Sequence, residues 1–294
     1  MKRSTVAILL VLVLIFGFSA CGSDNDSSDE EKLPSGSVGL EEDSSVSGND
    51  GLQSDYPPEI REIFEYASSE TAEQSGVCGE NIAWYYLDHT LVVKYLGEDR
   101  EGYIYINDYA RCNQVIENPW KESLYQEITK LIIDDRITNI GNDAFSGLTS
   151  LQEVYLPRQL DSIGSKAFFD CRQLEEIEIP EGFRNEGVNI KYWAFGNCKS
   201  LKKVLSTENI RSIDKAAFRD CESLVEFEIP DTITCIKDLT FDGCTSLTSL
   251  TLPDSVVEID GSNPFPYNCT IYYSNPDLEW YVAKYSDLCT WVKQ

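Results

Sequence analysis

The chain has 294 residues, with 24 Lys and Arg against 50 Asp and Glu, which gives a formal net charge of −26 at pH 7. Such an acidic chain repels nucleic acids and anionic lipid surfaces, so nucleic-acid binding is excluded as a function. A single histidine rules out a His-Glu-x-x-His zinc site, and no P-loop, Gly-x-Ser-x-Gly or Gly-x-Gly-x-x-Gly motif is present. We therefore expect no enzymatic activity, no cofactor and no metal site.

Residues 1–20 are predicted to be a secretion signal. They have a basic start and then an apolar run from Val6 to Phe18, which is too short for a settled membrane span. The run ends in Phe-Ser-Ala-Cys, which resembles the bacterial lipobox, with Phe18 in place of the usual Leu. The resemblance implies lipidation of Cys21, and two or three acyl chains would anchor the chain stably. An ordinary signal peptide with an incidental Cys21 is the alternative.

Residues 21–57 are predicted to be a flexible tether. They consist mainly of Ser, Gly, Asp and Glu, and such a composition cannot bury enough apolar surface to order itself. The acidic run after Cys21 also resembles an export tag of outer-surface lipoproteins in some Gram-negative bacteria. A calcium loop at Asp24 and Asp26 fits poorly, because the required Gly and bidentate Glu are misplaced. We therefore expect a protein of the cell envelope, outside the cytoplasmic membrane, that touches the membrane only through its lipid.

Two segments precede the central part of the chain. Residues 58–77 are predicted to be a short helix and linker, because apolar residues recur at helical spacing between Pro58 and Ser75. Residues 78–136 are predicted to be a β-rich capping module. Its hairpin turns at Asp88-His89-Thr90, and a third strand is expected over residues 102–106.

One pattern recurs through residues 137–256. It is Ala-Phe-x-x-Cys-x-x-Leu followed by a short alternating apolar segment and Pro, and its Phe residues are 23, 27, 23 and 23 residues apart. A fixed period in this range means stacked repeats, each too small to bury its own apolar positions. The alternating segment is a short strand, so we predict an α/β repeat solenoid of about five 23-residue coils with one parallel sheet. The repeated Phe residues are Phe145, Phe168, Phe195, Phe218 and Phe241.

The pattern resembles the BspA-type leucine-rich repeat of bacterial surface proteins. The resemblance covers roughly residues 78–284 and implies a right-handed solenoid that binds a macromolecule. A start at Cys78 with Cys-Gly-x-Asn-x-x-Trp, and a later Pro-Trp, are similar to the module that opens many members of this family. Residues 257–294 resemble its usual ending and are predicted to form a helical cap, with a helix that begins at Asn275-Pro276 and continues to Cys289.

Ten cysteines raise the question of a metal or redox site. Four of them occupy one repeat position, where the first repeat has Leu148, so we expect a buried column in which Cys acts as a small hydrophobe. Outside this column, Cys78–Cys112 and Cys269–Cys289 are possible disulfides, but the sequence does not fix the pairing. The four column cysteines are Cys171, Cys198, Cys221 and Cys244.

Candidate partner-binding residues lie on the outward face of the strands. Side chains alternate along a strand, so equivalent outward residues of successive coils form rows about 4.8 Å apart. An exposed Leu205 between Glu178 and Glu228 would suit a binding anchor, and a solvated face is the alternative. Four extra residues within residues 181–189 are predicted to form a loop near the binding side, or only a tolerated insertion. The candidates are Tyr155, Glu178, Lys203, Leu205 and Glu228 on strands, and Phe183 and Arg184 in the loop.

The function that these features favour is binding of a protein or other cell-surface macromolecule by a lipid-anchored surface protein. The family resemblance implies adhesion to host or neighbouring cells. The alternative is an envelope scaffold that binds another bacterial component. An enzyme is the least favoured, because no catalytic constellation is found.

Overall fold

The computed structural model describes residues 56–97, 104–106, 120 and 124–294. These residues belong to one compact unit, Ser47–Gln294, and the other unit, Met1–Val46, lies outside them. The predicted signal, the Cys21 lipidation site and residues 21–55 of the tether therefore lie outside the described residues. None of the described helices is long and apolar enough to cross a membrane.

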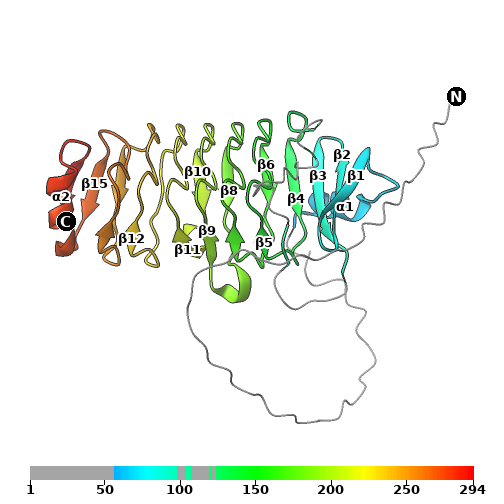
Figure 1. The fold of residues 1–294 in the computed structure, drawn as a ribbon, viewed down its shortest axis with the longest axis horizontal. Helices are drawn as coiled ribbons and strands as arrows, with labels where there is room; N and C mark the ends of the chain where they lie inside the picture. Colours follow the sequence, from blue (N-terminus) through cyan, green and yellow to red (C-terminus); the bar gives the residue numbers. More distant parts are fainter. Residues whose placement is uncertain (1–55, 98–103, 107–119, 121–123) are drawn as a thin grey trace, which may run out of the picture. The chain divides into compact units, whose positions relative to one another are not determined.

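Stacked coils form a solenoid with two rows of parallel strands (Figure 1). Strands one coil apart pair in register, as Lys203 does with Glu176 and Ser162 with Asn139. The first row contains β4 (Lys130–Ile133), β6 (Glu153–Tyr155), β8 (Glu176–Glu178), β10 (Lys203–Leu205), β13 (Ser249–Thr251), β15 (Thr270–Tyr273) and β16 (Thr290–Lys293). The second row contains β5 (Asn139–Ile140), β7 (Ser162–Ile163), β9 (Val188–Ile190), β11 (Ile210–Ile213), β12 (Cys235–Ile236) and β14 (Glu258–Ile259).

The stacked repeats are confirmed, but the prediction of one sheet with one strand per coil was wrong. Most coils carry a second strand, and several of these strands have only two residues, such as Asn139–Ile140. Two residues are too few for a period-2 alternation to show in the sequence. The fold also contains little α-helix, so the α/β description was wrong for the described residues.

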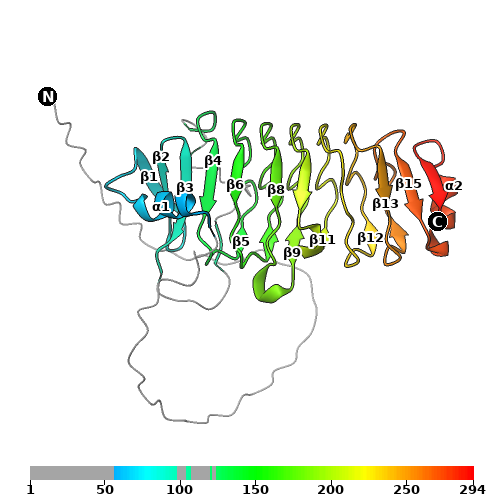
Figure 2. The ribbon, with the colours of Figure 1, turned by 180° about the vertical axis from the view of Figure 1, so that it is seen from behind.

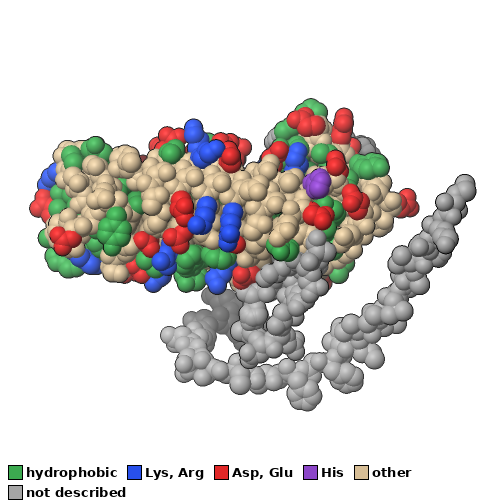
Figure 3. Space-filling model, turned by 90° about the horizontal axis from the view of Figure 1, so that it is seen from above, with side chains coloured by type: hydrophobic (Ala, Val, Ile, Leu, Met, Phe, Trp, Pro, Cys, Tyr) green, Lys and Arg blue, Asp and Glu red, His purple; other side chains and the backbone are tan. Residues whose placement is uncertain are grey.

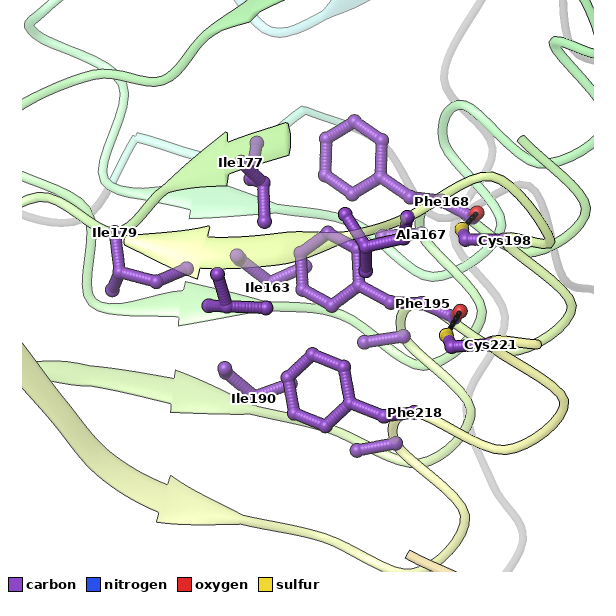
Figure 4. Packing of buried hydrophobic residues seen from close by; sticks show 14 of the residues in the cluster. Ile163, Ala167, Phe168, Ile177, Ile179, Ile190, Phe195, Cys198, Phe218 and Cys221 are labelled. Carbon is purple, nitrogen blue, oxygen red and sulfur yellow. Dashed lines mark hydrogen bonds between the residues drawn. The ribbon is translucent and has the colours of Figure 1, made fainter. Parts of the chain in front are cut away.

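The repeated Phe side chains form a continuous buried stack. Phe168 and Phe195 have ring centroids 5.4 Å apart with planes only 3° apart, and Phe195 and Phe218 are 5.5 Å apart (Figure 4). Trp120 continues the stack beyond Phe145, with centroids 5.4 Å apart. Because β4 pairs with β6, and β15 and β16 extend the first row, the coils continue past both ends of the five that we predicted.

The cysteine column lies beside this stack, as predicted, and its four members are fully buried. Each thiol donates a hydrogen bond to the carbonyl of the Phe one coil earlier; for example, Sγ of Cys198 is 3.1 Å from O of Phe168 (Figure 4). Burial raises the pKa of the Cys198 thiol to about 12. The column is therefore structural, because a buried thiol with a raised pKa is a poor nucleophile and a poor metal ligand.

An antiparallel sheet covers the N-terminal end of the solenoid. It contains β1 (Gln74–Gly79), β2 (Ile82–Leu87) and β3 (Thr90–Tyr95), and β3 pairs with β4 in parallel. The hairpin turn at Asp88 and His89 is confirmed, since both residues have φ above +40°. Strand β1 was not predicted. The described part of the predicted third strand, residues 104–106, forms an isolated bridge at Tyr105 with Asn139.

Helix α1 (Pro58–Tyr66) packs on the outer face of this N-terminal sheet (Figure 2). It is shorter than the predicted range, and its buried Ile60 and Phe64 lie in one cluster with Val92 and Ile132. The cluster closes the outer face of the sheet at this end, so apolar side chains are buried on both sides of β3 and β4.

Two buried carboxylates join the cap to the first coils. Asp134 accepts hydrogen bonds from the Tyr95 backbone N–H at 3.1 Å and from Arg136 Nη2 at 2.8 Å. Asp135 accepts a hydrogen bond from Arg158 Nε at 3.0 Å. Burial raises the pKa of Asp135, and the hydrogen bonds from Arg158 oppose that rise. A buried charge needs such partners, so this network fixes how the cap meets the solenoid.

The C-terminal end differs from the predicted helical cap. Asn275 caps a short 3₁₀ turn as predicted, accepting a hydrogen bond from the Asp277 N–H at 2.9 Å, but helix α2 is only Glu279–Lys284. The chain then forms strand β16, because Thr-Trp-Val favours a strand and pairs with β15. Cys289 is therefore not on a helix, and the possible disulfide with Cys269 is not formed.

Candidate functional site

The outward side chains of the first row form a surface that we call the outer sheet face. Where β8 and β10 pair, Lys203 lies opposite Glu176 and Leu205 opposite Glu178. Lys203 makes an ion pair with Glu226 of the following coil at 3.2 Å. The predicted contiguous rows are therefore confirmed at these strands.

Tyr155 lies on this face but was wrongly expected to be accessible. It is half-buried, with its ring 6.1 Å from that of Tyr56 in an edge-to-face contact. Its hydroxyl donates to Glu153 Oε2 at 3.3 Å, and burial raises its pKa. The cause is the α1 cluster, which covers the outer sheet face at the N-terminal end. Tyr155 is thus a packing residue for the cap.

Leu205 is half-buried, which corrects its description as an exposed anchor. It lies on β10 opposite Glu178 of β8. Glu178 and Glu228 are exposed as expected, and neither makes an ion pair with a described residue. The side chains that are accessible on this part of the outer sheet face are therefore mainly carboxylates, and Leu205 is only partly exposed.

The extra residues after β8 form a defined loop. Phe183–Asn185 make a short 3₁₀ turn, η1, with Arg184 at φ +55° and its guanidinium carbon 4.9 Å from the centre of the Phe183 ring. The N–H of Phe183 donates to the Leu160 carbonyl at 3.0 Å, so the turn is pinned to the previous coil. Arg184 is exposed and Phe183 half-buried. The loop lies at the far end of β8 (Figure 1), so it borders the outer sheet face.

The sequence favoured an attractive charge row at Lys203, but further ion pairs between equivalent positions of neighbouring coils were missed. Lys202 pairs with Glu175 at 2.7 Å and Lys199 with Glu222 at 2.7 Å. Opposite charges at the repeat spacing were the signal that could have found them. Figure 3 shows the result, with basic and acidic side chains side by side over the repeats. Exposed pairs of this kind contribute at most about 1 kcal/mol each, so they organise the surface more than they stabilise it.

The single histidine and the first cysteine of the capping module are placed apart from the outer sheet face. His89 is exposed in the hairpin turn, where its Nδ1 lies 3.0 Å from the Glu127 carbonyl. Cys78 is buried and its pKa is raised to about 12 by desolvation, while Cys112 lies outside the described residues. In the part of the chain that the structure describes, no group of three or more His, Cys, Asp or Glu side chains is placed to hold a metal ion.

The repeats match a family model for the BspA type leucine rich repeat region, in six copies over residues 123–189 and 182–275. The chain belongs to the BspA-type leucine-rich-repeat family. The match begins before Ile137 and ends after Val256, in agreement with the extra strands of the first row.

Solved structures of bacterial leucine-rich-repeat proteins are similar to this chain. A T. pallidum leucine-rich-repeat protein is 19% identical, with 77% of this chain and 99% of that chain covered and a TM-score of 0.44. A leucine-rich cell surface protein of Faecalibacterium prausnitzii is 20% identical, with coverages of 70% and 77% and a TM-score of 0.29. One from Bacteroides ovatus is 18% identical, with coverages of 72% and 76% and a TM-score of 0.37. No curated protein matches the sequence.

Proposed function

We propose that this BspA-type protein is held at the bacterial cell surface by a lipid on Cys21 and binds a protein partner through its outer sheet face. Adhesion to host or neighbouring cells is the role that we assign to it. The observation that carries the proposal is a rigid, solvent-facing row in which Glu178 and Glu228 make no ion pair with a described residue. A surface of fixed, unpaired carboxylates on a paired sheet is suited to recognition, because little ordering is needed when a partner binds.

The charge of this face indicates a basic partner segment. Glu176 and Glu178 are exposed on one coil and Glu228 on the second coil after it, whereas Lys203 of the coil between them is already paired with Glu226. The net charge of the chain, −26, adds a long-range field of the same sign. Complementary charge raises the rate of association and excludes acidic partners, and both effects weaken with salt.

Binding is tested with cells that produce the full chain, layered on immobilised host matrix proteins and on cell-envelope material. We expect saturable binding to a matrix protein that weakens at high salt and is lost when Glu178 and Glu228 are both changed to Lys. Glu258→Lys is the matched control, because Glu258 is exposed on β14 in the second row. Binding to envelope material alone would favour the scaffold, and binding that survives the double change would remove the outer sheet face from the proposal.

The anchor is tested separately by metabolic labelling with a radioactive fatty acid. We expect the full chain to be labelled and to sediment with membranes, and Cys21→Ala to lose both properties. Labelling that persists in Cys21→Ala would show that the lipid is attached elsewhere in the chain.

A further inference from the structure

A second surface, away from the outer sheet face, carries a cluster of aromatic side chains. It lies on the turns that follow the second-row strands β7, β9 and β11. The rings of Phe169 and Trp193 meet edge to face with centroids 5.5 Å apart, and Tyr192 and Trp193 are 6.2 Å apart. The Arg219 guanidinium carbon lies 5.1 Å from the centre of the Trp193 ring. We call these four residues the aromatic patch.

The Trp193 ring packs against Gly196 in the same turn. A Cβ added at Gly196 would lie 2.2 Å from Cε3 of Trp193, so the ring occupies the space that a side chain would fill. The neighbouring coils have Phe169 and Arg219 at this repeat position, and these two residues flank the ring. Glycine at this one coil therefore permits the aromatic side chain to settle between them.

The backbone beneath the patch is fixed by hydrogen bonds between coils. The N–H of Lys166 donates to the Tyr192 carbonyl at 2.9 Å, and the N–H of Trp193 donates to the Lys215 carbonyl at 3.3 Å. The rings are thus held by a rigid solenoid, so little conformational entropy is lost when a ligand binds to them.

Two rings of the aromatic patch are accessible to solvent to different degrees. Tyr192 is 41% exposed and Trp193 is half-buried. The Tyr192 hydroxyl and the Trp193 indole N–H make no hydrogen bond with another described residue. Tyr and Trp combine an apolar face with a hydrogen-bonding tip, and here the tips remain available to a ligand.

Most charges around the patch are already neutralised. Lys215 pairs with Asp238 at 2.7 Å, Lys237 with Asp214 at 2.9 Å, and Arg219 Nε lies 3.0 Å from Asp242 Oδ2. Exposed Lys166 and Lys191 make no ion pair with a described residue and keep their N–H donors available. A chain with a net charge of −26 nevertheless repels acidic polymers. The surroundings therefore suit an uncharged ligand with many hydroxyl groups.

We propose that the aromatic patch is a carbohydrate-binding site that stacks a neutral pyranose ring against the exposed Tyr192 ring, beside Trp193, whose plane is 80° from that of Tyr192. The C–H face of a pyranose is apolar and weakly positive, which complements the negative face of an aromatic ring. Its hydroxyls accept hydrogen bonds from the Trp193 N–H, the Tyr192 hydroxyl and the free ammonium groups. This site is independent of the protein-binding role of the outer sheet face.

The test is affinity electrophoresis of the full chain, in detergent, through native gels that contain dextran, laminarin, galactomannan or soluble starch. Native gels that contain polygalacturonate or dextran sulfate test acidic polysaccharides in the same way. We expect retardation in at least one neutral gel and an apparent Kd that Tyr192→Ala weakens at least about tenfold, with a smaller loss for Trp193→Ala. Trp280→Ala is the matched control, because Trp280 is 66% exposed on α2, outside the patch, and should leave the Kd unchanged.

Circular dichroism and Tm of each variant establish that it is folded, and Tyr192→Ala carries the test if Trp193→Ala is not. Three results would overturn the proposal: no retardation in any neutral gel, equal loss in the Trp280 control, or retardation only in the acidic gels. Protein binding by the outer sheet face is measured on the same variants. If a variant lost protein binding without a change in its retardation by the polysaccharide gels, the result would count against the proposed function and not against the carbohydrate site.

Discussion

The middle coils and the N-terminal end of this protein are built by different rules. In the middle, each core position meets the same position one coil away, as Phe195 meets Phe168 and Phe218. At the N-terminal end, unlike partners meet: Trp120 takes the place of a Phe, and buried Asp134 and Asp135 join the cap to the coils. Repetition makes the middle stable through many equal apolar contacts, whereas the end depends on a few specific polar ones.

Removing one ring from the middle of the stack should have the largest effect. Phe195→Ala leaves a cavity between two stacked rings in a fully buried column, and we expect a loss of about 3–5 kcal/mol in the free energy of unfolding. Urea unfolding followed by circular dichroism measures it. Phe183→Ala, at a half-buried ring outside the stack, should cost about 1 kcal/mol. Equal losses in the two variants would mean that the stack is not the main source of stability.

Removing a carboxylate from the polar junction between the cap and the first coils should have the second-largest effect on stability. Asp134→Ala leaves the Tyr95 N–H and the Arg136 guanidinium without their carboxylate, and we expect a loss of about 2–3 kcal/mol. Asp134→Asn keeps an acceptor and should lose less. Hydrogen exchange should show faster opening of β3 and β4 in the alanine variant while the Phe stack stays protected. Uniformly faster exchange along the chain would contradict a junction that acts locally.

The contrast between repeated contacts in the middle coils and unlike contacts at the N-terminal end also determines which features could be predicted from the sequence. The Phe and Cys columns repeat at a fixed spacing, so their burial followed from the pattern, and Glu178, Lys203 and Glu228 were correctly placed on an outward face. The cover over Tyr155 did not follow, because Tyr56 lies far away in the sequence and no repeat connects the two.

Other features were hidden for local reasons. The second row has strands too short to alternate visibly. The C-terminal helix was predicted to continue to Cys289 because apolar residues recur there at helical spacing, but α2 ends at Lys284, and strand β16 after Cys289 was not predicted. The aromatic patch needed the coil register, which places Gly196 between Phe169 and Arg219. Residues that act through neighbours one coil away are found only when that register is known.

A change in the cysteine column should have an intermediate effect. Cys198→Ala removes the sulfur and its hydrogen bond to the Phe168 carbonyl, so we expect a loss of about 1–2 kcal/mol. The midpoint of urea unfolding should fall with an unchanged slope. Cys235→Ala, at a half-buried thiol on β12, should lose less than about 0.5 kcal/mol. If Cys198 and the other column cysteines held a metal ion or formed a disulfide, chelators or reductants would instead lower the stability of the parent protein.

The surface ion pairs should have the smallest effect, and pH separates it from packing. The hydrogen bond from Lys215 lowers the pKa of Asp238 below its unfolded value. The pair therefore stabilises the folded state above the ordinary Asp pKa of about 3.9, and this contribution is lost as the pH falls through the lowered folded value. Because Lys215 is exposed and solvent screens its ion pair, we expect Lys215→Met to lower the midpoint of urea unfolding at pH 7 only slightly. The difference from the parent should disappear in urea unfolding well below pH 3.9. The control Lys166→Met removes no ion pair with a described residue and should show no pH-dependent difference in stability from the parent. A loss of stability in Lys215→Met that stays constant with pH would instead assign its effect to the packing of the Lys215 methylenes.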